Sequence, residues 1–166
     1  MSVVTEHLQQ QGSAFEVLAH RQAYTCADEA RALGVDAGEV VKTVAVRVGG
    51  GYALMVIPGS RRLDLRLVRD AVGDNHARLA TEDELRRDFA GYELGALPPL
   101  GALVSTRVCV DPEVLEYDTV AFAAGTQTES VKMRTQDLFG GAQVPPCRSP
   151  NVHTRATTTR SPSQHP

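Results

Sequence analysis

The stretch from Val40 to Gly59 reads VVKTVAVRVGGGYALMVIPG and contains two apolar runs separated by glycines. Both runs, Thr43 to Val48 and Tyr52 to Ile57, are rich in β-branched residues, which favour strands. The three glycines at 49–51 supply the turn of a β-hairpin. The first run alternates, which predicts one buried and one semi-polar face, whereas the second is apolar throughout, which predicts a central strand.

One residue of this stretch does not fit the strand pattern. Lys42 stands at the start of the first apolar run. A lysine at a strand end can extend its ammonium group to water while its methylenes stay on the apolar surface. Alternatively, the neighbouring strand holds Lys42 at the rim of a pocket, where the ammonium group binds a phosphate or polarises an ester carbonyl. The residues by themselves leave these two interpretations evenly balanced.

The rest of the chain mixes short helices with short strands. Helices are expected at residues 4–11, 26–33, 64–72, 82–89 and 135–140. Further strands are expected at residues 15–18, 102–105, 107–110, 120–124 and 130–134. Thr25 and the Thr81–Glu84 capping box mark helix starts, and Thr135 is expected to cap the last helix. Because no strict βαβ rhythm occurs, the pattern predicts an α+β fold with a mixed, mostly antiparallel sheet flanked by helices.

Composition indicates one globular domain with a tail. The chain has 166 residues, of which 42% are hydrophobic and 22% charged. Residues 1–144 are expected to form the domain. Residues 145–166, PPCRSPNVHTRATTTRSPSQHP, are rich in Pro, Ser and Thr without periodicity, which predicts a disordered tail.

The same composition limits the classes of function. The net charge of −3 does not indicate extended binding to a duplex such as DNA. No apolar run approaches the ~20 residues that span a bilayer, and the N-terminus lacks a secretory pattern, so a cytoplasmic protein without membrane contact is expected. The three cysteines are odd in number and widely spaced, which favours reduced thiols over a disulfide framework or a zinc site.

Several enzyme classes lack their motifs in this sequence. It contains no Walker loop, no GxGxxG after a strand, no HExxH and no GxSxG, and its five histidines have no metal-ligand spacing. An enzyme with this sequence is therefore expected to work without a metal or a tightly bound cofactor.

Two loops have unusual compositions. Residues 91–101, GYELGALPPLG, contain glycines that allow close approach to backbone N–H groups and prolines that stiffen the chain. Residues 123–130, AAGTQTES, form either a plain hairpin turn or one that presents Thr126 and its neighbours to a ligand. The first loop could instead be a structural crossover, although its density of glycines and prolines slightly favours a functional role.

Taken in order, VVKTVAVRV, GYELGALPPLG and VDPEVLEYDTVAFAAGTQTESVKM resemble the YbaK/prolyl-tRNA synthetase-associated editing domain, over roughly residues 13–140. The resemblance implies an α+β domain and a free-standing aminoacyl-tRNA deacylase that edits in trans. Its reaction is hydrolysis of the ester that joins a wrong amino acid to tRNA, often tRNA(Pro). The implied partners are the acceptor end of an aminoacyl-tRNA and an aminoacyl-tRNA synthetase, and no cofactor is implied.

The resemblance also assigns site residues. Lys42 matches the family's essential lysine, and Gly95 and Pro99 match its GxxxP motif, so these three are the expected catalytic positions. His20 and Tyr24 lie in AHRQAYT, which corresponds to a family segment near the pocket. The residues expected to bind substrate are His20, Tyr24, Met55, Gly101, Gly125 and Thr126.

Two positions depart from the family pattern. Ala123 stands where some members have serine, and Gln127 where many relatives have histidine, which puts substrate choice in question. No serine or cysteine nucleophile with a base is evident, so water is the expected attacker. The lost side chains leave an alternative open, a non-catalytic module that binds an aminoacyl-tRNA end or an aminoacyl-adenosine-like ligand. A hydrolase of some other small activated ester is a third possibility.

Overall fold

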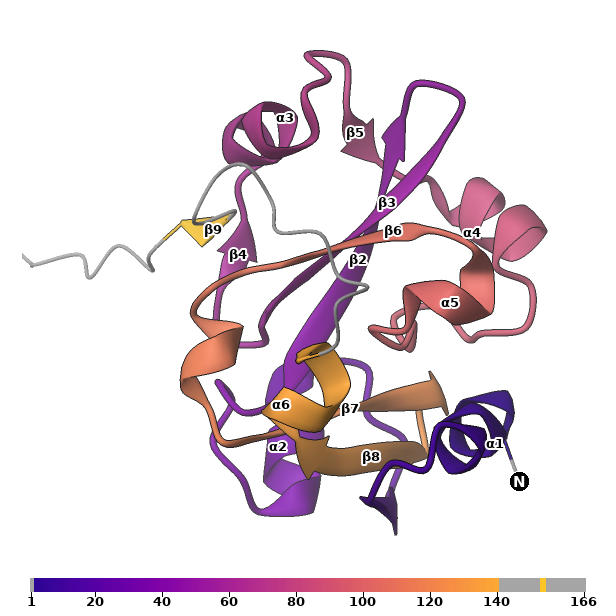
Figure 1. Ribbon diagram of the computed structural model, residues 1–166, viewed down its shortest axis with the longest axis vertical. Coiled ribbons are helices and arrows are strands. Elements are labelled where there is room, and N and C mark those ends of the chain that lie inside the picture. The colour runs from indigo at the N-terminus through magenta and orange to yellow at the C-terminus, as the bar shows by residue number, and fades with distance from the viewer. Residues whose placement is uncertain (1, 141–152, 155–166) are drawn as a thin grey trace, which may run out of the picture.

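The computed structural model describes residues 2–140 and 153–154, and short elements alternate along this part of the chain (Figure 1). The helices are α1 Val3–Gln10, α2 Cys26–Leu33, α3 Leu65–Val72, α4 Glu82–Asp88, α5 Gly101–Val104, α6 Thr135–Phe139 and the 3-10 turn η1 Val114–Glu116. The strands are β1 Phe15–Ala19, β2 Val41–Val48, β3 Gly51–Pro58, β4 Arg62–Leu63, β5 Arg78–Leu79, β6 Arg107–Val110, β7 Thr119–Thr126, β8 Glu129–Arg134 and β9 His153–Thr154.

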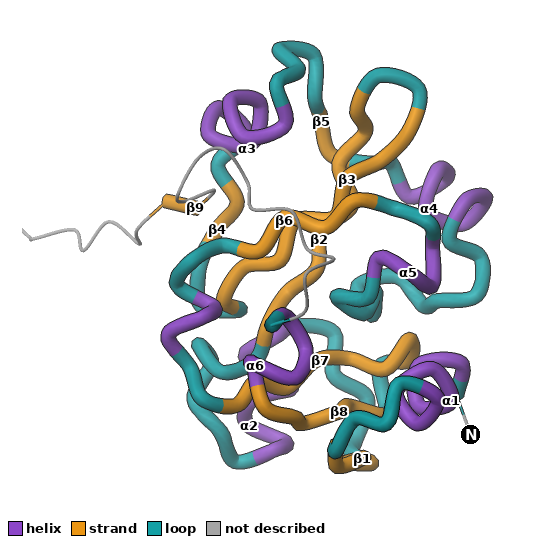
Figure 2. Tube along the Cα trace, viewed as in Figure 1, coloured by secondary structure: helices purple, strands orange, loops and turns teal. Residues whose placement is uncertain are grey.

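Two main sheets contain all of these strands except β4 and β9, which pair with each other (Figure 2). The four-stranded sheet has the order β5-β2-β3-β6, in which β6 runs parallel to β3 and the other pairs are antiparallel. The three-stranded sheet has the order β1-β8-β7 and is antiparallel throughout. The predicted α+β class with a mixed, mostly antiparallel arrangement is confirmed, although the strands divide between two main sheets.

The two predicted hairpins are present. Val48 pairs with Gly51, so Gly49 and Gly50 alone form the first turn, and Gly50 has a positive φ of 85°. The strand β3 lies between β2 and β6, which confirms its predicted central position. The second hairpin joins β7 to β8, with a register irregularity between Ala123 and Thr126.

Hydrophobic residues cover both faces of the four-stranded sheet. On one face, Leu54 and Val56 pack in a cluster that includes Phe122 of the other sheet. On the opposite face, Met55 packs in a second cluster with Val68 of α3. The buried Val46 agrees with the prediction of one buried face on β2, whereas the prediction of a semi-polar opposite face is wrong at Ala45, which is buried because elements distant in sequence cover that side of the strand as well.

Three other expectations differ from the structure. Residues 102–105 were expected as a strand, but Gly101–Val104 form the helix α5, because a short apolar run has no period that distinguishes a strand from a helix. Gly101 packs closely here, and a Cβ on it would lie 2.2 Å from the carbonyl oxygen of Thr106. Thr135 is the first residue of α6 and its side chain makes no capping bond. The expected tail at 145–166 lies outside the described residues, except for β9, which pairs with β4.

The described cysteines divide into two kinds. Cys26 is a free thiol, as expected, whereas Cys109 is disulfide-bonded, so the expectation of reduced thiols is wrong there. Sequence spacing does not show which cysteines lie close together in the fold. Among the described residues, no three or more His, Cys, Asp or Glu side chains are grouped so that they could hold a metal ion, and no helix has the length and apolar character needed to cross a membrane.

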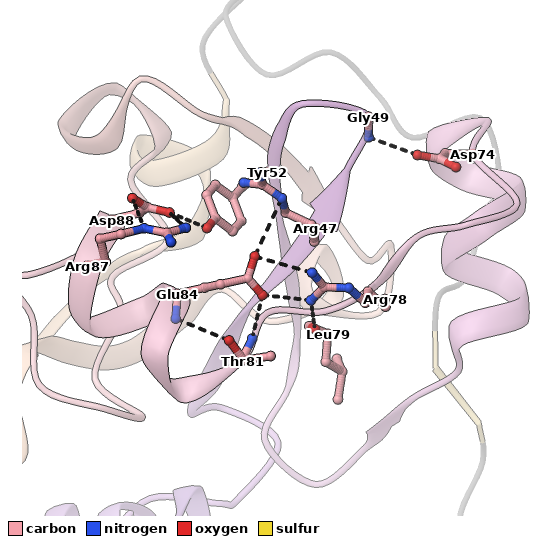
Figure 3. A network of polar contacts seen from close by, with 10 residues as sticks. All are labelled: Arg47, Gly49, Tyr52, Asp74, Arg78, Leu79, Thr81, Glu84, Arg87 and Asp88. Atoms are coloured by element: carbon pink, nitrogen blue, oxygen red, sulfur yellow. Dashed lines mark hydrogen bonds and ion pairs between the residues drawn. The ribbon is translucent and has the colours of Figure 1, made fainter.

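A polar network attaches α4 to the first hairpin (Figure 3). The predicted capping box is present, with Thr81 and Glu84 bonded reciprocally at 3.1 and 3.0 Å. The Glu84 carboxylate also accepts from Arg78 of β5 at 2.6 Å and lies 3.5 Å from Arg47 of β2. The Arg47 guanidinium lies 4.7 Å from the ring centre of Tyr52. These contacts hold β5 and α4 beside one edge of β2.

Candidate active site

A cavity of about 450 Å³ lies beside β2, at the edge of this strand that pairs with β5 rather than with β3. At one end of this edge, the N–H of Ala80 donates to the carbonyl of Ala45 at 3.0 Å, next to the short pairing of β2 with β5. At the other end, Val40 forms a parallel bridge with Ala121 of β7. Residues 41–45 line the cavity between these two ends. The cavity therefore lies where the partners of β2 change from one sheet to the other.

Unpaired polar groups lie along this gap. In an antiparallel strand, alternate residues direct their backbone polar groups to the same edge. Because Ala45 accepts from Ala80, the backbone groups of Thr43, two residues earlier, point to the same edge. The side-chain hydroxyls of Thr43 and Thr126 are buried without a hydrogen-bond partner in the described part of the chain, and both residues line the cavity. Such orphaned groups favour a polar ligand.

Lys42 lines the cavity and forms no ion pair within the described residues. The thiol of Cys26, at the start of α2, lies near it. Burial and the nearby Glu29 raise the pKa of this thiol to about 11, whereas Lys42 acts to lower it. A thiol with this pKa stays protonated near neutral pH and is a poor nucleophile. Lys42 therefore supplies a positive charge to a largely apolar cavity.

The loop at residues 91–101 forms another wall. Gly95 lines the cavity and has a positive φ of 80°, a conformation that glycine adopts without strain. Two backbone bonds join the loop to β7, from Gly125 N–H to Ala96 at 3.1 Å and from Glu93 N–H to Gly125 at 2.9 Å. Gly125 also has a positive φ of 88°. The loop is therefore held to the late hairpin at Gly125, through bonds to Glu93 and Ala96 on either side of Gly95.

Gln127 connects three parts of the wall. Its backbone N–H donates to the Glu93 carboxylate and its side-chain amide to the carbonyl of Leu94, both at 2.9 Å. Its side-chain oxygen accepts from Gln22, and its backbone oxygen accepts from Ala23, again at 2.9 Å each. The glutamine that departs from the family pattern thus joins the 91–101 loop to the segment after β1.

Five of the nine expected site residues line the cavity: Lys42, Gly95, His20, Tyr24 and Thr126. The other four lie outside it. Pro99 is a buried residue of the loop, Gly101 begins α5, and Gly125 holds the loop through its backbone. Met55 is fully buried on β3, in the cluster with α3, and Val46 lies in the same cluster. Gly101 has a packing role, since a Cβ there would meet Thr106 and Val108.

Sequence reasoning missed a buried polar chain in the same wall. Ser130 of β8 donates to the Glu29 carboxylate of α2 at 2.5 Å, and His20 Nε2 lies 2.8 Å from the Ser130 hydroxyl. Glu29 is 6% exposed and Ser130 is fully buried. In the sequence, Glu29 has the form of an acid in the first turn of a helix, and Ser130 that of a strand residue. Only a pairing of segments about a hundred residues apart could have revealed them.

Burial raises the pKa of the Glu29 carboxyl above its usual value, while the Ser130 hydrogen bond and His20 act in the opposite direction. Desolvation disfavours a buried charge, and a hydrogen-bond donor restores part of that loss. A carboxylate, a lysine and a glycine-bearing loop thus surround one cavity lined by small side chains. This is the arrangement of a small-ligand or catalytic site in an α+β domain.

Comparison with known proteins identifies the family. The family model described as the aminoacyl-tRNA editing domain matches residues 20–140, and the chain therefore belongs to that family. The resemblance inferred from the motifs is confirmed, and so is the expected enzyme class, an aminoacyl-tRNA deacylase that hydrolyses an ester bond.

Individual relatives agree with this assignment. The chain is 28% identical to the multifunctional Ser/Thr-tRNA deacylase ProXp-y of Escherichia coli K12, over 82% of this chain and 84% of that protein. It is 30% identical to the proline–tRNA ligase of Maridesulfovibrio salexigens over 66% of this chain, but over only 19% of that much longer protein.

Solved structures share the fold. The crystal structure of the hypothetical protein APE2540 superposes with a TM-score of 0.80 at 25% identity, covering 91% of this chain and 99% of that one. A candidate trans-editing enzyme for prolyl-tRNA synthetase superposes with a TM-score of 0.73 at 27% identity, covering 89% of this chain and 98% of that one.

Proposed function

We propose that this protein edits in trans, in the cytoplasm, by hydrolysing mischarged aminoacyl-tRNA in the cavity beside β2, with mischarged tRNA(Pro) as the first substrate class. The observation that carries the proposal is the presence of Lys42 and Gly95 in the lining of one cavity. The ammonium group of Lys42 binds the terminal nucleotide or the ester carbonyl. Backbone N–H groups of the Gly95 loop orient the attacking water or stabilise the oxyanion.

Water is the proposed nucleophile. Ser130 is fully buried, and the raised pKa of Cys26 keeps its thiol protonated, so neither is suited to attack a substrate. An aminoacyl ester is already activated, and its hydrolysis needs little beyond positioning and charge stabilisation. His20, Tyr24 and Thr126 contact the substrate directly, whereas Pro99, Gly101 and Gly125 shape the loop and Met55 supports β2 from the other face.

The lining supports selection of small aminoacyl groups. Side chains such as Ala23, Ala45, Ala96 and Ala123 are small, and the cavity of about 450 Å³ must also admit part of the terminal nucleotide. A single methylene is worth about 1–3 kcal/mol of discrimination, so exclusion of a larger cognate residue is within reach of such a site. The prolyl-ligase relatives support tRNA(Pro), and the Ser/Thr-tRNA deacylase relative supports hydroxylated aminoacyl groups.

The test is a deacylation panel. Purified protein is incubated with Ala-, Cys- and Ser-tRNA(Pro), with Ser- and Thr-charged tRNAs, and with Pro-tRNA(Pro), in the presence and absence of prolyl-tRNA synthetase. We expect release of the small amino acids and protection of proline, with faster editing when the synthetase is present. Lys42→Ala abolishes release, whereas Lys132→Ala, at the only other lysine of the chain, does not. An intact panel at high enzyme concentration contradicts the proposal.

A further inference from the structure

The buried chain beside the cavity has a defined direction of hydrogen bonding. Ser130 donates its hydroxyl proton to Glu29 at 2.5 Å. His20 Nδ1 lies 2.7 Å from the carbonyl oxygen of Arg21, which can only accept, so Nδ1 carries a proton. His20 Nε2 lies 2.8 Å from the Ser130 oxygen. The contacts thus join an imidazole through a hydroxyl to the carboxyl group of Glu29.

This chain offsets part of the cost of placing the Glu29 carboxylate inside an apolar wall. Burial favours the neutral acid, but a hydrogen-bond donor and a nearby positive charge favour the carboxylate. Ser130 provides the donor, and His20 provides the charge. For fold stability alone, an apolar side chain would avoid the desolvation cost of such a buried ion. The arrangement therefore serves better as a means of holding a base than as a means of holding the fold.

Glu29 also lies at the lysine end of the cavity. It is part of the lining together with Lys42, and Cys26 stands near both, since the two charges shift the pKa of its thiol in opposite directions. Beyond the bond from Ser130, the Glu29 carboxylate has no hydrogen-bond donor in the described part of the chain. Its second oxygen is therefore free to bind a water molecule next to the positive charge of Lys42.

We propose that Glu29 is the general base of the deacylation, with Ser130 and His20 as the residues that position it. The inference rests on the proposed function. A water molecule bound to Glu29 attacks the ester carbonyl, and its proton passes to the carboxylate as the new C–O bond forms. When the ester C–O bond breaks, Glu29 returns that proton to the departing ribose oxygen. The products are the free amino acid and a tRNA with its terminal hydroxyl restored.

A second role is chemically conceivable for a carboxylate at this position. It could bind the ammonium group of the aminoacyl moiety, in which case it would act only on substrates with a free amine. The two roles differ in the kinetic term that they change: a general base acts on kcat, whereas an ammonium anchor acts mainly on substrate binding. They also differ in their response to substrates whose amine is acetylated.

The experiment compares Glu29→Gln with Asp28→Asn, a neighbouring acid on the same helix whose side chain is 48% exposed. The substrates are the panel members that wild-type protein hydrolyses and their N-acetylated forms. We expect Glu29→Gln to lower kcat by about 10²–10⁴-fold for both forms while a non-hydrolysable aminoacyl-adenosine analogue still binds. Asp28→Asn should match the wild type.

Three outcomes overturn the inference. Wild-type kcat in Glu29→Gln shows that Glu29 is not the base. A loss confined to substrates with a free amine assigns it to ammonium binding. Inactivity of the wild type on the whole panel overturns the proposed function and this inference with it, whereas the first two outcomes leave the proposed function intact.

Ser130→Ala tests the positioning role and remains informative if Glu29→Gln fails to fold. The hydroxyl lowers the pKa of Glu29, so its removal should move the acid limb of the kcat profile to higher pH. The other ionisable side chains facing the cavity are His20, Tyr24, Cys26 and Lys42. Of these, His20 contacts Ser130 and acts to lower the pKa of Glu29. His20→Gln should therefore move the acid limb in the same direction as Ser130→Ala. A uniform loss of activity at every pH would show that Ser130 is merely structural.

Discussion

The helices α2 and α4 begin with the same sequence signature but place their acids in opposite surroundings. Each has a threonine cap, Thr25 or Thr81, followed three residues later by an acid. In α4 that acid, Glu84, closes the capping box and is bonded to Arg78, so the pKa of its carboxyl is lowered to about 2 (Figure 3). In α2 the next acid along, Glu29, is buried against β8, and burial raises its pKa.

The difference between them separates stability from function. Glu84 has cationic and backbone donors around it and contact with water, so its charge supports the attachment of α4 to the hairpin. Glu29 is bonded to the Ser130 hydroxyl, lies near His20 and lines a cavity, so burial disfavours its charge and its partners offset only part of that cost. Natural proteins tolerate such costly groups mainly where function requires them. Substitutions at the two sites should therefore have different consequences.

The largest stability effect should come from the buried chain. Ser130→Ala removes the donor to Glu29, and a buried polar group that loses its partner costs about 1–3 kcal/mol. We expect the free energy of unfolding at pH 7, measured by urea denaturation, to fall by that amount while the protein remains folded. A variant as stable as the wild type would mean that water replaces the hydroxyl and that the chain is less enclosed than its burial indicates.

A smaller effect, with opposite signs at the two sites, should follow Glu→Gln substitution. The lowered pKa of Glu84 gives stability that is present above the unfolded value near 4.5 and lost as pH falls toward 2. The raised pKa of Glu29 acts in reverse, since the folded state loses stability as pH rises above about 4.5.

At pH 7, therefore, Glu84→Gln should lower the melting temperature, and Glu29→Gln should leave it unchanged or raise it. Thermal unfolding of both variants between pH 3 and pH 8 measures this, with the Asp28→Asn variant as the control. If both substitutions lower the melting temperature equally at pH 7, the contrast between the two acids does not hold.

The smallest effect belongs to the outer face of α4. Arg86 forms ion pairs with Glu82 at 3.4 Å and Asp83 at 3.6 Å, and its side chain is 60% exposed. Exposed pairs at this helical spacing contribute about 0.3–0.5 kcal/mol and are screened by salt. Arg86→Ala should therefore change the free energy of unfolding by no more than that, and less in 1 M salt. A loss above 1 kcal/mol would show that the α4 network extends to its exposed face.

The local elements were predictable where local chemistry decides them. The helix α2 has the predicted bounds, because Thr25 caps its start and Gly34 adopts the left-handed conformation at its end. The hairpins followed from β-branched runs around glycine-containing turns. The helix α5 was mistaken for a strand, because a run of four residues is too short to show a period that distinguishes a strand from a helix.

The candidate site was predictable where one residue carries the motif and obscure where distant residues share it. Lys42 and Gly95 stood out in the sequence because a lysine in an apolar strand and a glycine in a proline-containing loop are unusual. Glu29 did not stand out, because its contact with Ser130 joins residues 101 positions apart. Met55 was expected at the cavity, but strand alternation and the position of α3 direct it into the other hydrophobic cluster.

The sequence by itself determined the alternation of strands and helices, their caps and turns, and the family to which the motifs belong, because these depend on residues within a few positions of one another. The tertiary structure alone decided that the partners of β2 change beside Lys42 and leave a cavity there. It also decided which of two similar acids is buried. Both outcomes depend on the way in which the two sheets meet, and no local pattern records that contact.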